Sequence, residues 1–169
     1  MSIHVALVGS MGTGKTTVGR LLAGMLGRSY LDNDDRLVEL TRAGPAELTA
    51  RDGLASLHAL EATLLLEALA GVPPAVVAGA ASVVDDAACR AALHTRAFTV
   101  WLVAPPEVVA RRTQATGRPR QSEDLARLAA RRAKHYQEVS RMRVDTSAHP
   151  AREAAALIAA AVRDATGAP

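Results

Sequence analysis

The chain has 169 residues and a net charge of +3, with 49% hydrophobic but only 2% aromatic residues. This length suits one α/β domain spanning residues 1–169, and the scarcity of aromatic residues predicts an aliphatic, alanine-rich core. No apolar run reaches the ~18–20 residues of a membrane span, and the first residues lack the charged start of a signal peptide. The single Cys89 matches no metal-ligand spacing and indicates a reducing compartment. We therefore expect a cytoplasmic protein with no membrane partner.

Positive charge is concentrated between residues 111 and 143, where ten Lys or Arg stand against three Asp or Glu. Such a block suits either nucleic acid or the phosphates of a bound nucleotide. No aromatic interleaving supports base stacking, and the basic residues are spaced along helices rather than gathered in one tract. The pattern favours a phosphate site over a nucleic-acid partner. We also expect a monomer.

Strand and helix patterns alternate along the chain, which is typical of a parallel sheet covered on both faces. The predicted strands are residues 3–8, 29–31, 75–78, 98–103 and 142–144. Six predicted helices are residues 15–26, 36–42, 45–52, 54–70, 125–139 and 150–165. Two more are predicted between them: one is capped by Asp85 or Asp86 and reaches about Leu93, and the other begins at Pro106. Residues 116–124 lack apolar periodicity and are predicted to form a mobile lid. The predicted fold is an α/β three-layer sandwich with a five-stranded parallel sheet.

The segment from Gly9 to Thr16, GSMGTGKT, fits the P-loop pattern G-x-x-x-x-G-K-[ST] at every fixed position. An apolar strand precedes it and a helix follows, so an ordinary glycine turn is disfavoured. The loop amides and the helix N-terminus would form an anion cradle, with Lys15 reaching the β- and γ-phosphates and the Thr16 hydroxyl binding Mg²⁺. The predicted ATP-binding residues of this segment are Gly12, Thr13, Gly14, Lys15, Thr16 and Thr17.

The second predicted strand ends at Asp32-Asn33-Asp34, on the edge of the sheet that carries the P-loop. One carboxylate could hold Mg²⁺ through water while the other orients or deprotonates an acceptor hydroxyl. A plain alternative is that Asp34 or Asp35 caps the next helix. No guanine-reading N-K-x-D motif is present, and the strand ending at Ala78 carries no Walker-B acid. The pattern favours a small-molecule kinase over a GTPase or a motor-type ATPase.

These segments together resemble the shikimate kinase family. The resemblance is closest from Gly9 to Asp35, and continues through RDGLASLHALEA (51–62), VVAGAA (76–81), GRP (117–119), RRAKHY (131–136) and MRVDT (142–146). It implies the nucleoside-monophosphate-kinase arrangement of the P-loop fold, with a lid, and ATP and Mg²⁺ as cofactors.

Residue by residue, the resemblance implies that Asp32 sits near Mg²⁺ and that Asp34 binds the acceptor hydroxyl as base. Arg118 would be the lid arginine that reaches the phosphates, so the implied catalytic residues are Lys15, Asp34 and Arg118. Arg132 would contact the acceptor carboxylate, with a structural salt bridge as the alternative. Arg112 and Pro150 would flank adenine, although a solvated helix face is an equal alternative for Arg112.

The acceptor half departs from the family pattern. Leu57-His58 stands where the family has Phe-Arg, and Gly79-Ala80-Ala81 stands where it has three glycines. An imidazole cannot replace a bidentate guanidinium without loss. The two added methyl groups would narrow the pocket or disfavour a positive φ, and Glu61 could raise the basicity of His58. The expected acceptor-binding residues are Asp34, His58, Gly79, Ala80 and Arg132.

The sequence thus predicts ATP-dependent phosphorylation of a hydroxyl on a small cyclic polyol acid, with shikimate as the leading candidate. Two alternatives remain open: a kinase of a different polyol or hydroxy acid, and a nucleotide-binding regulator without phosphotransfer.

Overall fold

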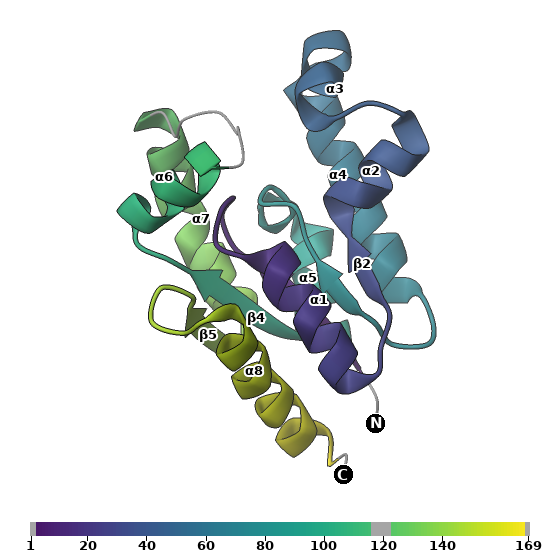
Figure 1. The fold of residues 1–169 in the computed structure, drawn as a ribbon. Helices are drawn as coiled ribbons and strands as arrows, with labels where there is room; N and C mark the ends of the chain where they lie inside the picture. The colour runs from purple at the N-terminus through teal and green to yellow at the C-terminus, as the bar shows by residue number, and fades with distance from the viewer. Residues whose placement is uncertain (1–2, 116–122, 168–169) are drawn as a thin grey trace.

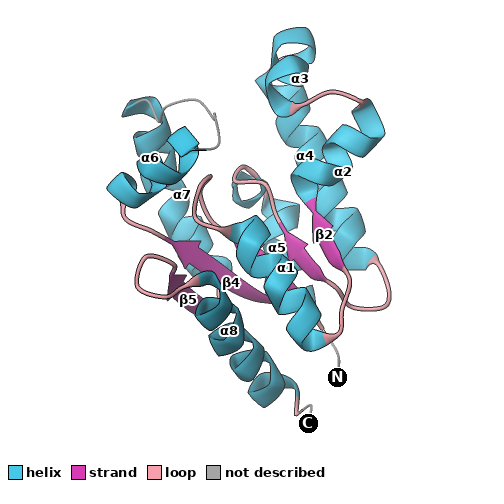
Figure 2. Cartoon of the chain, in the orientation of Figure 1, coloured by secondary structure: helices cyan, strands magenta, loops and turns pink. Residues whose placement is uncertain are grey.

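The computed structural model describes residues 3–115 and 123–167. At its centre, five parallel strands form one sheet (Figure 1, Figure 2). In chain order they are β1 (His4–Val8), β2 (Tyr30–Asp32), β3 (Val76–Ala78), β4 (Ala97–Val103) and β5 (Met142–Asp145). Their order in the sheet is β2-β3-β1-β4-β5, and all pairs are parallel. The carboxyl ends therefore lie along one edge, as the alternating pattern predicts.

Eight α-helices and one short 3₁₀ helix connect these strands in the described residues. They are α1 (Lys15–Leu26), α2 (Asn33–Thr41), α3 (Pro45–Asp52), α4 (Leu54–Ala70), the 3₁₀ helix η1 (Val83–Asp85), α5 (Ala87–Arg96), α6 (Pro106–Ala115), α7 (Glu123–Val139) and α8 (Ala151–Thr166). None of the helices in these two stretches is long and apolar enough to cross a membrane.

The sheet is covered on both faces because alternate strand residues point to opposite sides. Val5 and Leu7 of β1 pack with α1 and α8 on one face, and Ala6 and Val8 pack with α4, α5 and α7 on the other. Figure 1 shows α1 and α8 side by side in front of the strands. Both core clusters are mostly aliphatic and alanine-rich, which confirms the composition-based prediction.

A third, smaller cluster joins α2, α3 and α4 beyond the β2 edge of the sheet. It is built from Leu37, Ala43, Leu48, Leu57 and Leu64. These helices rise past the carboxyl edge on one side of the P-loop, and α6 and α7 rise on the other (Figure 1). The two arms therefore flank the edge where the predicted site lies.

Three predicted boundaries are wrong by two residues or more: the start of α2, the start of α7 and the end of α5, which runs to Arg96 rather than to about Leu93. The second strand runs to Asp32, and α2 begins at Asn33 with Asp32 as its N-cap, so neither Asp34 nor Asp35 is the cap. Asp32 accepts a hydrogen bond from the Asp34 amide at 3.0 Å, which supplies the cap that this helix needs. The helix α7 begins at Glu123, two residues before the predicted start. The rest of the predicted lid, residues 116–122, lies outside the described residues.

Candidate active site

The P-loop runs from the end of β1 to the start of α1, and its shape depends on glycine. Gly9, Gly12 and Gly14 all have positive φ, at 146°, 81° and 95°. A Cβ on Gly12 would lie 3.0 Å from side-chain carbons of both Val109 and Thr113, so the absent side chain also lets α6 pack on the loop. Successive amides of such a loop, followed by a helix N-terminus, bind anionic groups.

Lys15 lies along this loop at the start of α1. Its Nζ donates to the carbonyl oxygens of Gly9 at 2.8 Å and Ser10 at 3.0 Å. The ammonium group is therefore held against the backbone of the loop. This arrangement places a positive charge where the terminal phosphates of a nucleotide would enter the cradle.

Asp32, the last residue of β2, connects this strand to the start of α1. Its Oδ2 accepts from the Tyr30 hydroxyl at 2.6 Å and from the Thr16 hydroxyl at 3.1 Å, and the residue is only 9% exposed. Burial raises the pKa of Tyr30 well above its usual range, and the contact with Asp32 adds to this shift. Tyr30 therefore remains a neutral hydrogen-bond donor to the carboxylate.

These oxygen atoms fit a magnesium ion. Thr16 and Asp32 place a hydroxyl and a carboxylate oxygen next to the phosphate cradle, and Mg²⁺ in kinase sites takes few protein ligands besides phosphate oxygens and water. Accordingly, no cluster of three or more His, Cys, Asp or Glu suited to a metal occurs in residues 3–115 and 123–167. Asp34 follows on the exposed first turn of α2, at the same edge of the sheet.

The residues expected to bind the acceptor lie near a group of charged side chains contributed by α4, η1 and α7. Arg132 is 7% exposed, and its Nε and Nη2 both donate to Oδ2 of Asp85, at 2.8 Å and 2.6 Å. The buried Glu61 accepts a short hydrogen bond from Ser82. Burial raises the pKa of Glu61, and the negative charge of Asp34 raises it further, which indicates that the two carboxylates are near each other.

His58 lies in this group, but Glu61 does not make it more basic. Burial lowers the pKa of His58, and the positive charge of Arg132 lowers it further. The carboxylate that opposes this shift is Asp85. The expectation that Glu61 raises the basicity of His58 is therefore wrong, because Glu61 is engaged with Ser82 and the cation Arg132 is the dominant charge near the imidazole.

The loop after β3 is fixed by main-chain contacts. The Gly79 amide donates to the Leu7 carbonyl at 3.0 Å, and the Tyr136 hydroxyl of α7 donates to the Ala81 carbonyl at 2.9 Å. Among the described residues only one non-glycine, Arg42, has a positive φ, so Ala80 and Ala81 are not strained. Their methyl groups were expected either to narrow the acceptor pocket or to disfavour a positive φ. The second effect does not apply, so only a narrower pocket remains as an expectation.

Arg112 braces the nucleotide side rather than pointing to solvent. Its Nη1 donates to the Thr146 hydroxyl at 2.9 Å and its Nη2 to the Thr146 carbonyl at 2.8 Å. The Thr146 hydroxyl in turn donates to the Thr13 carbonyl in the P-loop at 2.8 Å. The solvated-face alternative for Arg112 is therefore wrong. Pro150 is the N-cap residue of α8, which follows the same β5 loop, and Arg118 lies outside the described residues.

Three contacts of the site involve residues that sequence reasoning did not select: Tyr30, Asp85 and Thr146. Asp85 and Arg132 are 47 residues apart in the sequence, and Thr13 and Thr146 are 133 residues apart. No local sequence pattern can therefore predict either contact. Tyr30 does carry a signal, because it lies two residues before Asp32 on the same strand and alternation puts both on one face.

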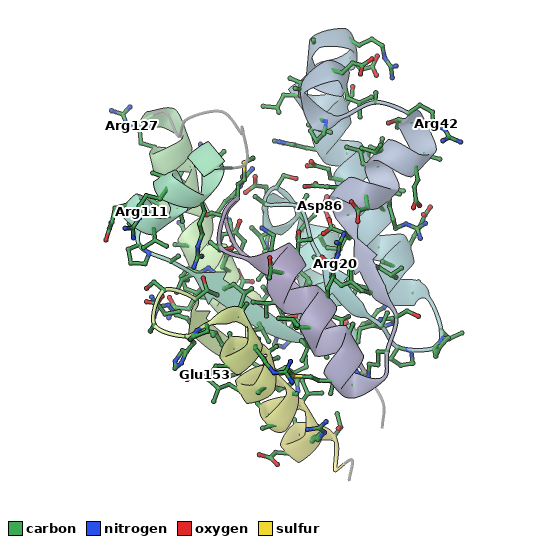
Figure 3. All side chains as sticks on the ribbon, viewed as in Figure 1. Arg20, Arg42, Asp86, Arg111, Arg127 and Glu153 are labelled. Atoms are coloured by element: carbon green, nitrogen blue, oxygen red, sulfur yellow. The ribbon has the colours of Figure 1, made fainter. Side chains whose placement is uncertain are left out.

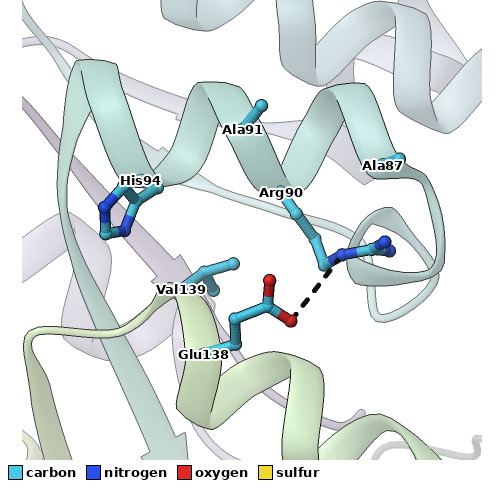
Figure 4. A pocket seen from close by; sticks show the side chains of 6 residues that line it. All are labelled: Ala87, Arg90, Ala91, His94, Glu138 and Val139. Carbon is cyan, nitrogen blue, oxygen red and sulfur yellow. Dashed lines mark ion pairs between the residues drawn. The ribbon is translucent and has the colours of Figure 1, made fainter.

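Two surface pockets lie apart from this constellation. One is formed between α5 and α7 by Ala87, Arg90, Ala91, His94, Glu138 and Val139, with Arg90 Nε 3.9 Å from Glu138 Oε2 (Figure 4). The other is lined by residues of α3 and α4, including Leu57. Neither contains a predicted site residue. The exposed Arg111 and Arg127 project outward from α6 and α7 (Figure 3).

A P-loop, a hydroxyl and carboxylate pair beside it, and a second carboxylate on the same edge of a β2-β3-β1-β4-β5 sheet define a phosphotransferase of the small-molecule kinase class. The family model for shikimate kinase matches residues 11–163. The chain therefore belongs to the shikimate kinase family, whose members are ATP-dependent kinases that use Mg²⁺.

Individual relatives agree over nearly the whole chain. Shikimate kinase 2 of Sodalis glossinidius is 35% identical over 89% of this chain and 90% of its own length. Shikimate kinase of Symbiobacterium thermophilum is 37% identical over 85% of this chain and 87% of its own length. The structure of shikimate kinase from Acinetobacter baumannii in complex with shikimate superposes with a TM-score of 0.86, at 30% identity over 96% of this chain and 94% of that one.

Proposed function

We propose that this protein transfers the γ-phosphoryl group of ATP to a hydroxyl of shikimate. The observation that carries the proposal is the P-loop facing the Asp32–Thr16 pair and Asp34, within a chain of the shikimate kinase family. Shikimate combines ring hydroxyls with one carboxylate, so its site needs both a general base and a cation.

Each part of the proposed site has a distinct task. The P-loop amides and Lys15 would hold the β- and γ-phosphates, while Thr16 and Asp32 would hold Mg²⁺, which neutralises charge on those phosphates. Asp34, exposed beside them, would orient the acceptor hydroxyl and accept its proton. Arg112 and Pro150 would flank adenine and Arg118 would reach the phosphates. We propose His58, Gly79, Ala80 and Arg132 as the acceptor-binding residues.

Acceptor-stimulated release of ADP tests this proposal. Purified protein with MgATP should release ADP rapidly with shikimate, and only at background rate without an acceptor. A panel of cyclic polyol acids and neutral polyols should be poorer acceptors. Turnover on a neutral polyol but not on shikimate would contradict the proposal, and would suit the altered residues His58 and Ala80.

The Lys15→Ala variant controls for contaminating kinases. It should lose nearly all turnover because it lacks the charge that faces the terminal phosphates, and alanine is well tolerated at a helix start. Thermal unfolding would verify that the variant is folded. Near-normal turnover in folded Lys15→Ala would contradict the role given to the P-loop.

A further inference from the structure

The ion pair between Arg132 and Asp85 bears on how the site takes a carboxylate. Arg132 is the buried cation of the acceptor side, on α7, and its charge is felt by both His58 and Glu61. A guanidinium binds a carboxylate best through two parallel N–H groups on one edge. Here the Nε–Nη2 edge already donates both of its hydrogens to Asp85 Oδ2.

Asp85 is available for this contact because its neighbour does the capping. Either Asp85 or Asp86 is suited by sequence to cap α5, and it is Asp86 that accepts from the Cys89 amide at 2.8 Å. Asp85 instead ends η1, and its backbone is held by hydrogen bonds to Ser82 and from Arg90. Its side chain is 37% exposed whereas that of Arg132 is 8% exposed, so the carboxylate reaches the buried cation from the solvent side.

We infer that Asp85 is a specificity-determining residue that competes with the acceptor carboxylate for Arg132. This inference rests on the proposed function, because it takes Arg132 as the group that receives the acceptor carboxylate. An incoming carboxylate must either displace Asp85 from the Nε–Nη2 edge or bind the remaining edge beside a negative charge. Both routes weaken binding of anionic acceptors, and His58 offers little compensation because burial and Arg132 both lower the pKa of its imidazole.

The decisive variant is Asp85→Asn, which keeps the shape of the side chain and removes its charge. The KM for shikimate should fall about tenfold, since removing one competing charge from a partly buried site is worth about one such factor. The KM for ATP should not change, and neither should that for the methyl ester of shikimate, which lacks the charge. Asp164→Asn, an exposed residue of α8, is the matched control and should leave every constant unchanged.

The opposite result has a clear meaning. If Asp85 served only to orient Arg132, its loss would raise the KM for shikimate, and an increase or no change in a folded variant would overturn the inference. Should Asp85→Asn fold poorly, Asp85→Ser makes the same charge change with a smaller side chain and the same expected decrease.

A second measurement separates this inference from the proposed function. Calorimetric titration with cyclohexenecarboxylate, a ring carboxylate without hydroxyls, reports on the cation whatever the acceptor is. Absence of shikimate turnover in the wild-type protein would contradict the proposed function alone. Tighter binding of cyclohexenecarboxylate by Asp85→Asn than by wild type would still support the competition, and equal or weaker binding would overturn it.

Discussion

At the scale of single residues, the two aspartates of the D-x-D segment have different surroundings. Asp32 is buried, caps α2 and accepts from Tyr30 and Thr16, whereas Asp34 is exposed on the first turn of α2. A buried carboxylate with fixed partners suits a structural task at the metal, and an exposed one can meet a substrate. The difference supports the separate roles proposed for them.

Asparagine substitutions should separate these roles. Asp34→Asn should reduce shikimate-dependent turnover by about 10²-fold or more, because the amide cannot accept the hydroxyl proton, while ATP binding is spared. Asp32→Asn keeps a good N-cap but loses a carboxylate oxygen, so it should raise the Mg²⁺ concentration needed for half-maximal turnover. Both quantities come from titrations of ADP release.

Asp35→Asn is the matched control for both variants. Asp35 lies in the same turn of α2, is exposed and pairs only loosely with Arg20 at 3.5 Å, so its substitution should leave turnover near the wild-type level. The separate roles would be refuted if Asp32→Asn and Asp34→Asn were equally defective in the Mg²⁺ titration and neither had an effect specific to the acceptor.

The lowered pKa of His58 leads to a prediction about pH. Since burial and Arg132 move the pKa below the ordinary value of 6.5, the imidazole is mostly neutral at pH 7 and gains charge in more acidic solution. The KM for shikimate should therefore change little from pH 8 to 7 and improve as the pH falls further, at lower pH than an ordinary imidazole would give. His58→Gln, which cannot be protonated, should abolish the improvement. An acidic improvement that persists in His58→Gln would assign it to another group.

At the scale of elements, helix α1 carries two glycines with opposite surroundings. A Cβ on Gly19 would lie 2.4 Å from the ring of Tyr30 and 3.2 Å from Leu7, whereas a Cβ on Gly24 would meet nothing within 4 Å. Gly19 thus lets α1 approach β1 and β2 closely. This approach is what brings Thr16 and Tyr30 to the same oxygen of Asp32.

Alanine substitutions at these glycines should have opposite effects. Gly24→Ala should stabilise the protein by about 0.5–1 kcal/mol, because glycine costs about that much inside a helix. For a chain of this length that corresponds to an increase in Tm of roughly 1–4 °C. Gly19→Ala should lower Tm and, by displacing Tyr30, raise the Mg²⁺ requirement. Thermal unfolding of the pair tests this, and a Gly19→Ala protein as stable as Gly24→Ala would show that α1 does not need the close approach.

At the scale of the whole molecule, the buried Glu61 makes the free energy of unfolding depend on pH. Its pKa in the folded state is raised above the ordinary value of 4.5, chiefly by burial. The folded state therefore holds this proton more tightly than the unfolded state does. The resulting stabilisation is present at acidic pH and is lost as the pH rises through the folded-state pKa.

Replacing Glu61 with Gln should remove this contribution. Gln retains an oxygen for the Ser82 hydroxyl and cannot ionise, so the variant should gain stability relative to wild type as the pH rises from about 4.5 to 7. Urea unfolding at several pH values measures the difference. Glu67→Gln, on an exposed position of α4, should show no such trend. A difference between Glu61→Gln and wild type that does not vary with pH would contradict the raised pKa.

Local sequence patterns are enough to predict the succession of strands and helices along the chain, the P-loop and the class of reaction. These features depend on residues that are close together in the sequence. Periodicity separates strands from helices, and glycines mark the loop. Gly27 ends α1 in the left-handed conformation expected of a C-terminal glycine. The boundary between β2 and α2 was missed because Asp32 is at once the last residue of a strand and the cap of a helix. Propensity cannot separate those two roles.

The partners of the charged residues follow from the folded structure and not from the sequence. By sequence Arg132 suits an acceptor carboxylate, with a salt bridge as the alternative, and the packing of α7 against η1 brings Asp85 to it. In the same way, the parallel sheet brings Thr146 to the P-loop, and Arg112 follows. This is so because charged residues show no periodicity along the chain that would identify their partners. The pKa and the partner of such a residue depend on which distant elements fold over it and remove it from water.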